Sequence, residues 1–148
     1  MQVFIIGSPL DTAKNLDRRR LNKQIIECQQ ILNAIDGKTK SWSNHPCTIQ
    51  YREHRSWLIN YLNTLIHYRR YIVHQNGFYL EAAKICDCCA NKLIPDFHTS
   101  AYFDNMKRRL YTKNPQHYSQ WSKLGKSEEN WYYVDGVMRR YVNGKRIN

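Results

Sequence analysis

The stretch LDRRRLNKQIIECQQILNAI, from Leu16 to Ile35, decides the fold that we expect for this chain. Its apolar positions recur every three or four residues, at Leu21, Ile25, Cys28, Leu32 and Ile35. This spacing is typical of an amphipathic helix, and the glycine that follows at position 37 predicts its end. The rest of the stretch is strongly basic, yet it keeps a single acid, Glu27, in its middle.

The place of Glu27 on this helix leaves two interpretations open. On a helical wheel it falls at the edge of the apolar stripe, near Gln24, so its carboxylate can face a groove without being buried. Arg19, Arg20 and Lys23 are expected in more exposed sectors. The acid then either forms a salt bridge to Lys23, one turn away, or takes part in catalysis.

The remaining periodicity predicts a mainly α fold. Residues 1–15 end in SPLDTAKN, which we interpret as a turn marked by Pro and Asp. The Asp-Gly pair inside NWYYVDGVMRRYV predicts a small C-terminal β-hairpin. Besides the first helix we expect helices over residues 48–73, 78–93 and 98–113, the last capped near Thr99 or Ser100, and a turn in NPQHYSQW. We therefore expect one compact helical domain, residues 1–148.

Charge and composition favour a nucleic-acid partner. The chain has 148 residues, 42% of them hydrophobic, and a formal net charge of +11. Such a charge on a small domain is typical of polyanion binding, although solubility alone is the alternative. Eleven tyrosines could stack on unpaired bases while Lys and Arg hold phosphates. We expect no signal peptide and no membrane span, and therefore a soluble, cytoplasmic protein, which we also expect to be a monomer.

The five cysteines do not form a recognisable metal or disulfide framework. Cys86, Cys88 and Cys89 lie in one CDCC run, with no second pair of the kind that structural zinc needs. We expect all five, including Cys28 and Cys47, to be small apolar residues on helices. No metal and no cofactor are predicted.

The common catalytic motifs are missing from the sequence, but a nucleophile need not be a side chain. There is no phosphate-binding glycine loop, HExxH site or G-x-S-x-G elbow. An α-amino group has an intrinsic pKa of about 7.7–8.0 and is partly neutral at physiological pH. Such an amine can attack a sugar C1′, displace the base and leave a Schiff base. This chemistry needs only a buried chain start and one carboxylate, for which Glu27 is the candidate.

Several pieces of the sequence, in this order and spacing, resemble the pyrimidine dimer DNA glycosylase family, of the phage endonuclease V type and of a related bacterial and phage branch. The pieces are MQVF, the stretch from Leu16 to Ile35, Trp42 to Pro46, His98 to Ser100, KNPQHY from Lys113, and NWYY near the C-terminus. The resemblance implies an endonuclease V-like helical fold. It also implies a glycosylase with AP lyase activity on damaged or modified double-stranded DNA, in the cytoplasm of a bacterial or phage-infected cell.

The resemblance also implies roles for particular residues. Matching Leu16 and Leu21 places the family's catalytic glutamate on Glu27, and the N-terminal amine is the nucleophile. Family members expose a small second residue after losing the first methionine. Here residue 2 is Gln, too bulky for efficient removal of Met1, so the catalytic candidates are Met1, Gln2 and Glu27.

The candidate DNA contacts are basic, aromatic and polar side chains from several segments. They are Arg18, Arg19, Arg20, Lys23, Trp42, Asn44, His45, His98, Lys107, Arg108, Arg109 and Lys113. Trp42 is either a stacking platform for a base or a core residue, and His98 is either functional or structural. A DNA-binding protein that lacks catalysis is the alternative to a glycosylase, and a nucleotide- or RNA-directed enzyme is a more remote one.

Overall fold

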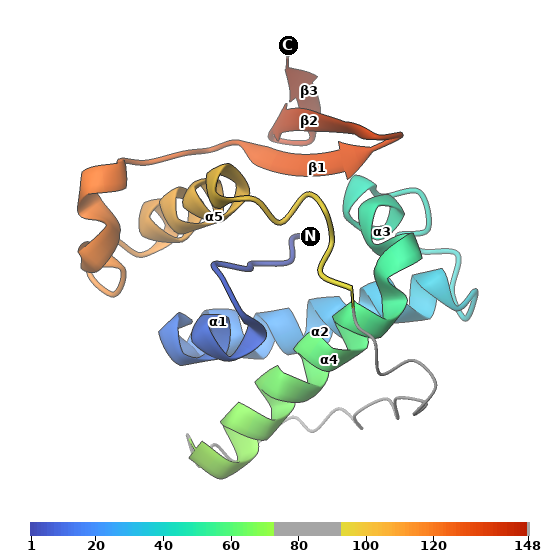
Figure 1. Cartoon of the computed structure of the whole chain (residues 1–148), viewed down its shortest axis with the longest axis horizontal. Helices are drawn as coiled ribbons and strands as arrows, with labels where there is room; N and C mark the ends of the chain where they lie inside the picture. The colour runs from blue at the N-terminus through green and yellow to red at the C-terminus, as the bar shows by residue number, and fades with distance from the viewer. Residues whose placement is uncertain (73–92, 148) are drawn as a thin grey trace.

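The computed structural model describes residues 1–72 and 93–147, and the helix expected over residues 78–93 lies almost wholly outside these ranges. The described chain is mainly helical, with a small antiparallel sheet at its C-terminal end (Figure 1). Its α-helices and strands are α1 (Pro9–Asn15), α2 (Arg18–Ile35), α3 (Pro46–Tyr51), α4 (Arg55–His67), α5 (Ser100–Lys113), β1 (Asn130–Val134), β2 (Val137–Val142) and β3 (Lys145–Ile147). The predicted mainly α fold class is confirmed for this part of the chain.

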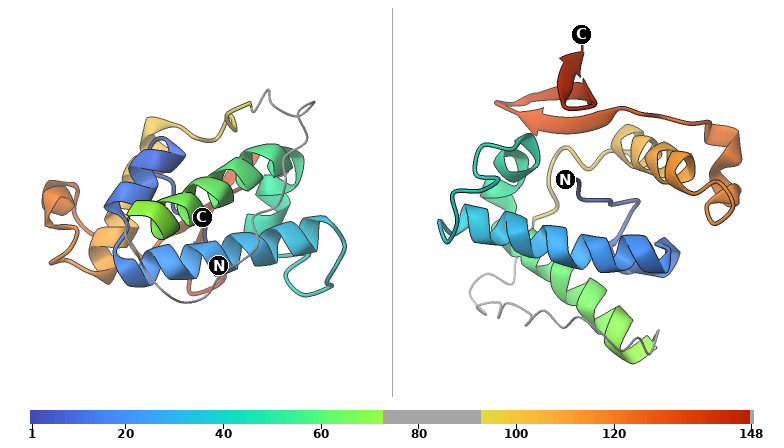
Figure 2. Two further views of the ribbon diagram at one scale, coloured as in Figure 1. Left: turned by 90° about the horizontal axis from the view of Figure 1, so that it is seen from below. Right: turned by 180° about the vertical axis from the view of Figure 1, so that it is seen from behind.

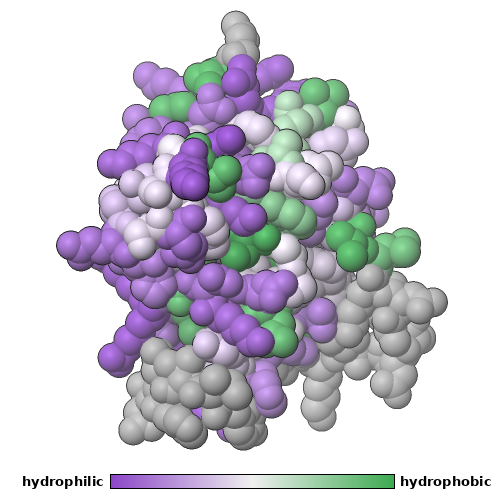
Figure 3. Space-filling view, turned by 60° about the vertical axis from the view of Figure 1, so that its left-hand side comes forward, coloured by the Kyte–Doolittle hydropathy of each residue, from purple (hydrophilic) through white to green (hydrophobic). Residues whose placement is uncertain are grey.

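Helix α2 forms where the apolar spacing predicted it. Its N-cap is Asp17, whose side chain accepts a hydrogen bond from the backbone N–H of Arg20 at 3.0 Å. Leu21, Ile25 and Cys28 are at most 1% exposed, so the apolar stripe faces the core. On the face shown in Figure 3, by contrast, hydrophilic residues predominate and hydrophobic ones occur in small groups.

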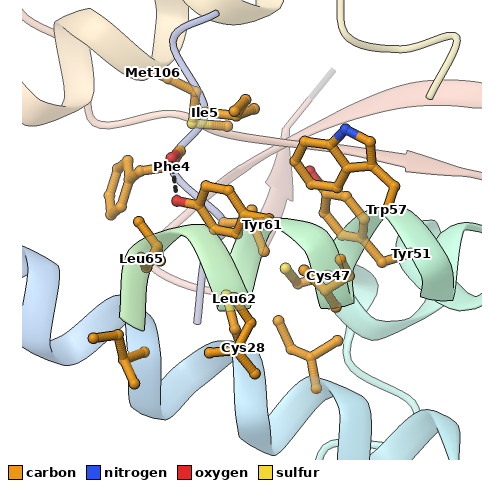
Figure 4. Close-up of a cluster of buried hydrophobic side chains, with 14 of the residues drawn as sticks. Phe4, Ile5, Cys28, Cys47, Tyr51, Trp57, Tyr61, Leu62, Leu65 and Met106 are labelled. Carbon is orange, nitrogen blue, oxygen red and sulfur yellow. Dashed lines mark hydrogen bonds between the residues drawn. The ribbon is translucent and has the colours of Figure 1, made fainter. Parts of the chain in front are cut away.

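The N-terminal segment runs through the core in an extended conformation. Val3 and Ile5 are fully buried, and the Tyr61 hydroxyl of α4 donates a hydrogen bond to the Phe4 carbonyl at 2.5 Å. Figure 4 shows this bond among the packed side chains of α2, α3 and α4. The buried cysteines Cys28 and Cys47 belong to the same core, as predicted. The core therefore fixes the position of the chain start.

The turn expected over residues 8–15 is wrong, because this segment is helix α1. The Ser8 side chain caps the helix by accepting from the backbone N–H of Asp11 at 3.1 Å. Pro9 occupies the first helical position, where its missing N–H costs nothing and its fixed φ suits the helix. Pro and Asp here mark a helix start rather than a turn.

The single helix expected over residues 48–73 is also wrong, because four shorter elements take its place. Helix α3 begins earlier than expected, with Pro46 in its first turn and the His45 side chain as its cap. A 3₁₀ turn, Arg52–His54, separates α3 from α4, and a π-helical turn, Tyr68–Ile72, follows α4. His54 adopts φ −123° and ψ 33°, outside the helical region, and this interrupts the helix.

The C-terminal third follows its local signals closely. Helix α5 begins after Thr99, whose hydroxyl caps Tyr102 N at 3.3 Å, as predicted. Strands β1 and β2 form the predicted hairpin, with Asp135 and Gly136 both at positive φ in the two-residue turn. Strand β3 pairs with β2 and was not expected, although Asn143-Gly144 repeats the same turn signal. Between α5 and the sheet, NPQHYSQW forms the expected turn and then a 3₁₀ helix, Ser119–Leu124.

Throughout residues 1–72 and 93–147, every helix is too short or too polar to span a lipid bilayer.

Candidate active site

A small polar cavity of about 70 Å³ lies beside the chain start. Seen from behind, the N-terminus lies between α2 and α5, below β1 (Figure 2, right). The cavity is lined by Met1, Gln2, Phe4, Arg20, Lys23, Gln24, Glu27, Arg109, Lys113 and Asn130. It therefore joins all three predicted catalytic residues to four of the predicted DNA contacts.

Glu27 presents its two carboxylate oxygens to different neighbours. Oε1 lies 3.7 Å from the Nζ of Lys23, so the predicted salt bridge is present. Oε2 lies 3.4 Å from the backbone N of Gln2 and 3.3 Å from the Nε2 of Gln24, both of which donate to it. The carboxylate side chain is 13% exposed, and that of Lys23 is 62% exposed. The salt bridge thus uses only one oxygen, and the other faces the chain start.

The first two residues are held from both sides. The Tyr132 hydroxyl of β1 donates to the Met1 carbonyl at 2.8 Å. The Gln2 side chain is 5% exposed and donates through Nε2 to the sulfur of Met106 at 3.4 Å. Glu27 Oε2 therefore lies next to the Gln2 amide nitrogen, and Met1, the preceding residue, also lines the cavity.

The cavity carries an excess of positive charge. Arg20, Lys23, Arg109 and Lys113 face the single carboxylate of Glu27. Burial lowers the pKa of Lys113, and the positive charges of Arg109, Arg20 and Lys23 lower it further. Burial also lowers the pKa of Arg109. Charges crowded in this way are relieved by a bound anion, which a DNA backbone supplies.

Some polar atoms at the cavity have no hydrogen-bond partner within the described part of the chain. The Nε atoms of Arg20 and Arg109 and the Oδ1 of Asn130 are buried in this state. Buried polar groups are ordinarily paired, so these three atoms carry hydrogen-bonding capacity that the described part of the chain does not use. Arg20 was expected in an exposed sector of α2 and is instead half-buried at the cavity.

Other predicted DNA contacts lie outside the cavity. Arg18 and Arg19 are exposed on the first turn of α2. Lys107 lies 3.9 Å from Asp104, one turn earlier in α5. Arg108 donates through Nε to the Leu124 carbonyl at 2.9 Å, which ties α5 to the 3₁₀ helix.

Trp42 lies in the loop between α2 and α3 and is 45% exposed, so its interpretation as a core residue is wrong. It adopts a φ of 66°, unusual for a bulky residue. Its ring meets that of His45 edge to face at 5.5 Å, and His45 meets Tyr132 at 5.6 Å. His45 also accepts from Cys47 N as the cap of α3, while Asn44 beside it is exposed. Aromatic contacts thus connect Trp42 through His45 to Tyr132, whose hydroxyl bonds the Met1 carbonyl.

His98 lies in an aromatic cluster that does not border the cavity. Its Nε2 is 2.9 Å from the Tyr51 hydroxyl, and its ring centroid is 4.6 Å from that of Trp57. Burial, with a further effect from His54, lowers the pKa of His98 to about 3. The imidazole is therefore neutral at physiological pH and is not placed to hold a phosphate.

Three residues that line the cavity were not among the predicted site residues: Phe4, Gln24 and Asn130. Tyr132, which bonds the Met1 carbonyl beside the cavity, was not predicted either. Gln24 carried a detectable signal, since it is an amide within the apolar stripe of α2. Among residues 1–72 and 93–147 no group of three or more His, Cys, Asp or Glu side chains could hold a metal ion. Cys86, Cys88 and Cys89 lie outside these ranges.

Comparison with known proteins bears on the family of this chain. Residues 1–70 match the family model described as pyrimidine dimer DNA glycosylase. The predicted resemblance to this family is thereby confirmed over these residues, and the family implies glycosylase activity and DNA binding in general. The match includes Met1, Gln2 and Glu27, but ends before α5 and its cations. Searches of curated proteins and of solved structures gave no match.

Proposed function

We propose that this protein is a DNA glycosylase with AP lyase activity, which uses the α-amine of Met1 as nucleophile and Glu27 as acid/base. The observation that carries the proposal is the cavity that the chain start shares with Glu27, whose Oε2 lies 3.4 Å from the Gln2 nitrogen. Four cations around this pair suit the phosphates on either side of a target nucleotide.

The reaction follows from these groups. The neutral amine attacks C1′ of the sugar, the bond from C1′ to the base breaks, and the base leaves with the bonding electrons and takes up a proton. The sugar ring then opens to a protonated Schiff base, and its ring oxygen becomes a hydroxyl. The Glu27 carboxylate stabilises the positive charge that develops at C1′. It then accepts a proton from C2′, and β-elimination expels the 3′ phosphate before water releases the enzyme.

Gln2 makes Met1 the residue that carries the nucleophile. Its bulk disfavours removal of the first methionine, and its buried side chain anchors the segment against Met106. The Tyr132 hydroxyl fixes the carbonyl of Met1 itself. The amine is therefore presented by a held residue rather than by a loose chain end, which favours a defined attack geometry.

The substrate we propose is double-stranded DNA with a damaged or modified base. Arg20, Arg109 and Lys113 would hold phosphates at the cavity. Exposed Trp42 would stack on a base that has left the helix, since unstacking has to be compensated. The alternative is a DNA-binding protein on the same fold without catalysis, which shares every one of these contacts.

Borohydride trapping separates the two functions. The protein is incubated with a duplex that contains one abasic site, and borohydride reduces any Schiff base to a stable adduct. A glycosylase/lyase gives a covalent protein–DNA band that is absent with a tetrahydrofuran analogue, which has no C1′ aldehyde. A protein that binds the abasic duplex tightly and gives no adduct would be the non-catalytic alternative.

A further inference from the structure

Gln24 is a buried polar residue of α2, one turn before Glu27. Its side chain amide makes four hydrogen bonds, and the residue is 1% exposed. Oε1 accepts from the Phe4 backbone N at 2.9 Å and lies 2.9 Å from the Tyr61 hydroxyl, whose single proton it shares with the Phe4 carbonyl. Nε2 donates to the Gln2 carbonyl at 2.5 Å and to Glu27 Oε2 at 3.3 Å. A carboxamide has two N–H groups and two acceptor lone pairs, so its capacity is fully used.

These partners allow only one orientation of the amide. Its nitrogen faces two acceptors, the Gln2 carbonyl and the Glu27 carboxylate, and its oxygen faces two donors. A flipped amide would bring oxygen against oxygen on one side and nitrogen against N–H on the other. The group is therefore held rigidly, because buried polar groups left unpaired are costly.

The partners of Gln24 come from three segments that meet at the chain start. They belong to the N-terminal segment, to α4 and to α2 itself. We propose that Gln24 is a positioning residue, which fixes the separation between the Glu27 carboxylate and the segment that carries Met1. The proposal rests on the function proposed above. A misplacement of about 1 Å can cost on the order of a hundredfold in rate, so one amide that holds both groups has a large effect.

The bond to Glu27 distinguishes this role from simple core packing. Three of the four bonds tie backbone and Tyr61 together and would serve stability in any folded chain. The fourth, to Glu27 Oε2, is directed to the carboxylate alone. A carboxyl introduced at position 24 would lie against this oxygen, and two carboxyls that share a proton change how activity depends on pH, which loss of packing does not.

The Gln24→Glu variant tests the proposal with little change in shape. It places a second carboxyl oxygen where Nε2 now faces Glu27 Oε2 and the Gln2 carbonyl. Two carboxyls at this distance share a proton up to a higher pH than one carboxyl does. The matched control is Gln29→Glu, the same change on the same helix, because Gln29 bonds Asn33 and does not border the cavity.

The measurements are the single-turnover rate of borohydride trapping on an abasic duplex across pH, and affinity for the tetrahydrofuran duplex. For Gln24→Glu we expect the acidic limb of the rate profile to move up by about one pH unit. The rate at neutral pH should fall at least about tenfold, with affinity within about threefold. Gln29→Glu should keep the wild-type profile. A folded Gln24→Glu protein whose acidic limb coincides with that of the wild type would overturn the proposal.

If Gln24→Glu does not fold, a measurement on the wild-type protein tests the role proposed for Gln24. In NMR spectra the side-chain amide protons of Gln24 should shift with pH at the same midpoint as the acidic limb of trapping, and should lose this dependence in Glu27→Gln. Amide resonances that do not respond to pH would overturn the role assigned to Gln24. Absence of trapping in the wild type, by contrast, would overturn the proposed function itself.

Discussion

The cavity at Glu27 and the aromatic cluster at His98 are both built around an ionisable side chain that the sequence marked as functional. At the cavity, Arg20, Arg109 and Asn130 keep buried polar atoms that have no partner in the described chain. In the cluster, His98 is bonded through Nε2 to Tyr51, packs against several rings and is neutral, and the hollow that it lines beside α1 has no charged side chain among its described residues. The comparison teaches that unpaired polar atoms beside a cavity rich in cations favour a binding site, whereas an imidazole held neutral among aromatic rings favours a structural role.

The largest effect should come from Glu27→Gln at the cavity. Glutamine keeps the shape and can accept the two bonds from Gln2 N and Gln24 Nε2, but it loses the salt bridge to Lys23 and neither takes a proton nor balances a cationic sugar. Loss of a general acid/base typically lowers the rate about 10²–10⁴-fold. We expect single-turnover trapping of an abasic duplex to slow at least about a hundredfold, with affinity unchanged or slightly higher as a negative charge leaves the site.

The matched control is Glu53→Gln in the 3₁₀ turn between α3 and α4, an exposed glutamate that does not border the cavity. It should keep the wild-type rate. Full activity in Glu27→Gln would leave this carboxylate with only its salt bridge to Lys23, and would remove the distinction drawn between the two regions.

His98 should affect stability and its dependence on pH, not the reaction. In the unfolded chain His98 takes up a proton near its ordinary pKa of 6.5, whereas in the folded chain its pKa is about 3. Because the unfolded state then binds more protons, stability is full above pH 6.5 and is lost as pH falls toward 3. We expect a loss of roughly 1–2 kcal/mol in the free energy of unfolding at pH 5.

Chemical denaturation across this pH range provides the measurement. His98→Phe should flatten the dependence, while the exposed His117→Phe should retain it. An equally steep loss of stability in His98→Phe would show that other groups titrate there, and a loss of trapping in a folded His98→Phe would place the cluster among the functional regions.

Trp42→Ala should weaken recognition without weakening the fold. The ring is 45% exposed, and stacking on a base is worth about 1–3 kcal/mol. We expect affinity for a duplex that carries a damaged base to fall about tenfold, affinity for undamaged duplex to fall much less, and the melting temperature to stay near that of the wild type. Trp121→Ala is the control, because Trp121 stacks on Tyr118 at 5.4 Å and should lose stability instead. Equal weakening on both duplexes would exclude a stacking role for Trp42.

The smallest expected effect is a difference in salt dependence of DNA binding between variants of two neighbouring arginines of α5, Arg108 and Arg109. Arg109 borders the cavity with an unpaired Nε, while Arg108 bonds the Leu124 carbonyl. Neutralising a phosphate contact lowers the slope of log K against log salt by about one. We expect this for Arg109→Gln in a salt titration, and a loss of about 1 kcal/mol in stability with little change of slope for Arg108→Gln. The reverse result would move the phosphate contact to Arg108.

The fold could be predicted wherever its cause is local. Each of three features depends on residues that are close together in the sequence. They are the apolar period of α2, the Thr99 cap of α5 and the Asp-Gly turn of the hairpin. The interruption after α3 lies at His54 and has no periodic signal, and next to it Arg55 at the start of α4 forms an ion pair with the distant Asp36 at 2.6 Å. Such contacts between distant segments give no periodic signal in the sequence.

The same distinction between local and long-range contacts applies to the residues of the candidate site. Glu27 and the cations of α2 could be predicted, because a helical wheel and the family resemblance place them. Tyr132 could not, since its bond to Met1 joins residues 131 positions apart. The unpaired state of Arg109 likewise depends on how α5 packs against β1 and the chain start, and composition says nothing about it.

The most direct test of the central claim is the position of the trapped adduct on the chain. After borohydride reduction with an abasic duplex, nuclease digestion and proteolysis leave a sugar remnant whose mass can be mapped by tandem mass spectrometry. The proposal predicts the remnant on the α-amine of Met1, with Met1 retained. The rival amine is that of Lys113, which lines the same cavity and whose pKa is lowered. A remnant on Lys113 or on Lys23, with an unmodified Met1, would contradict the assignment of the nucleophile.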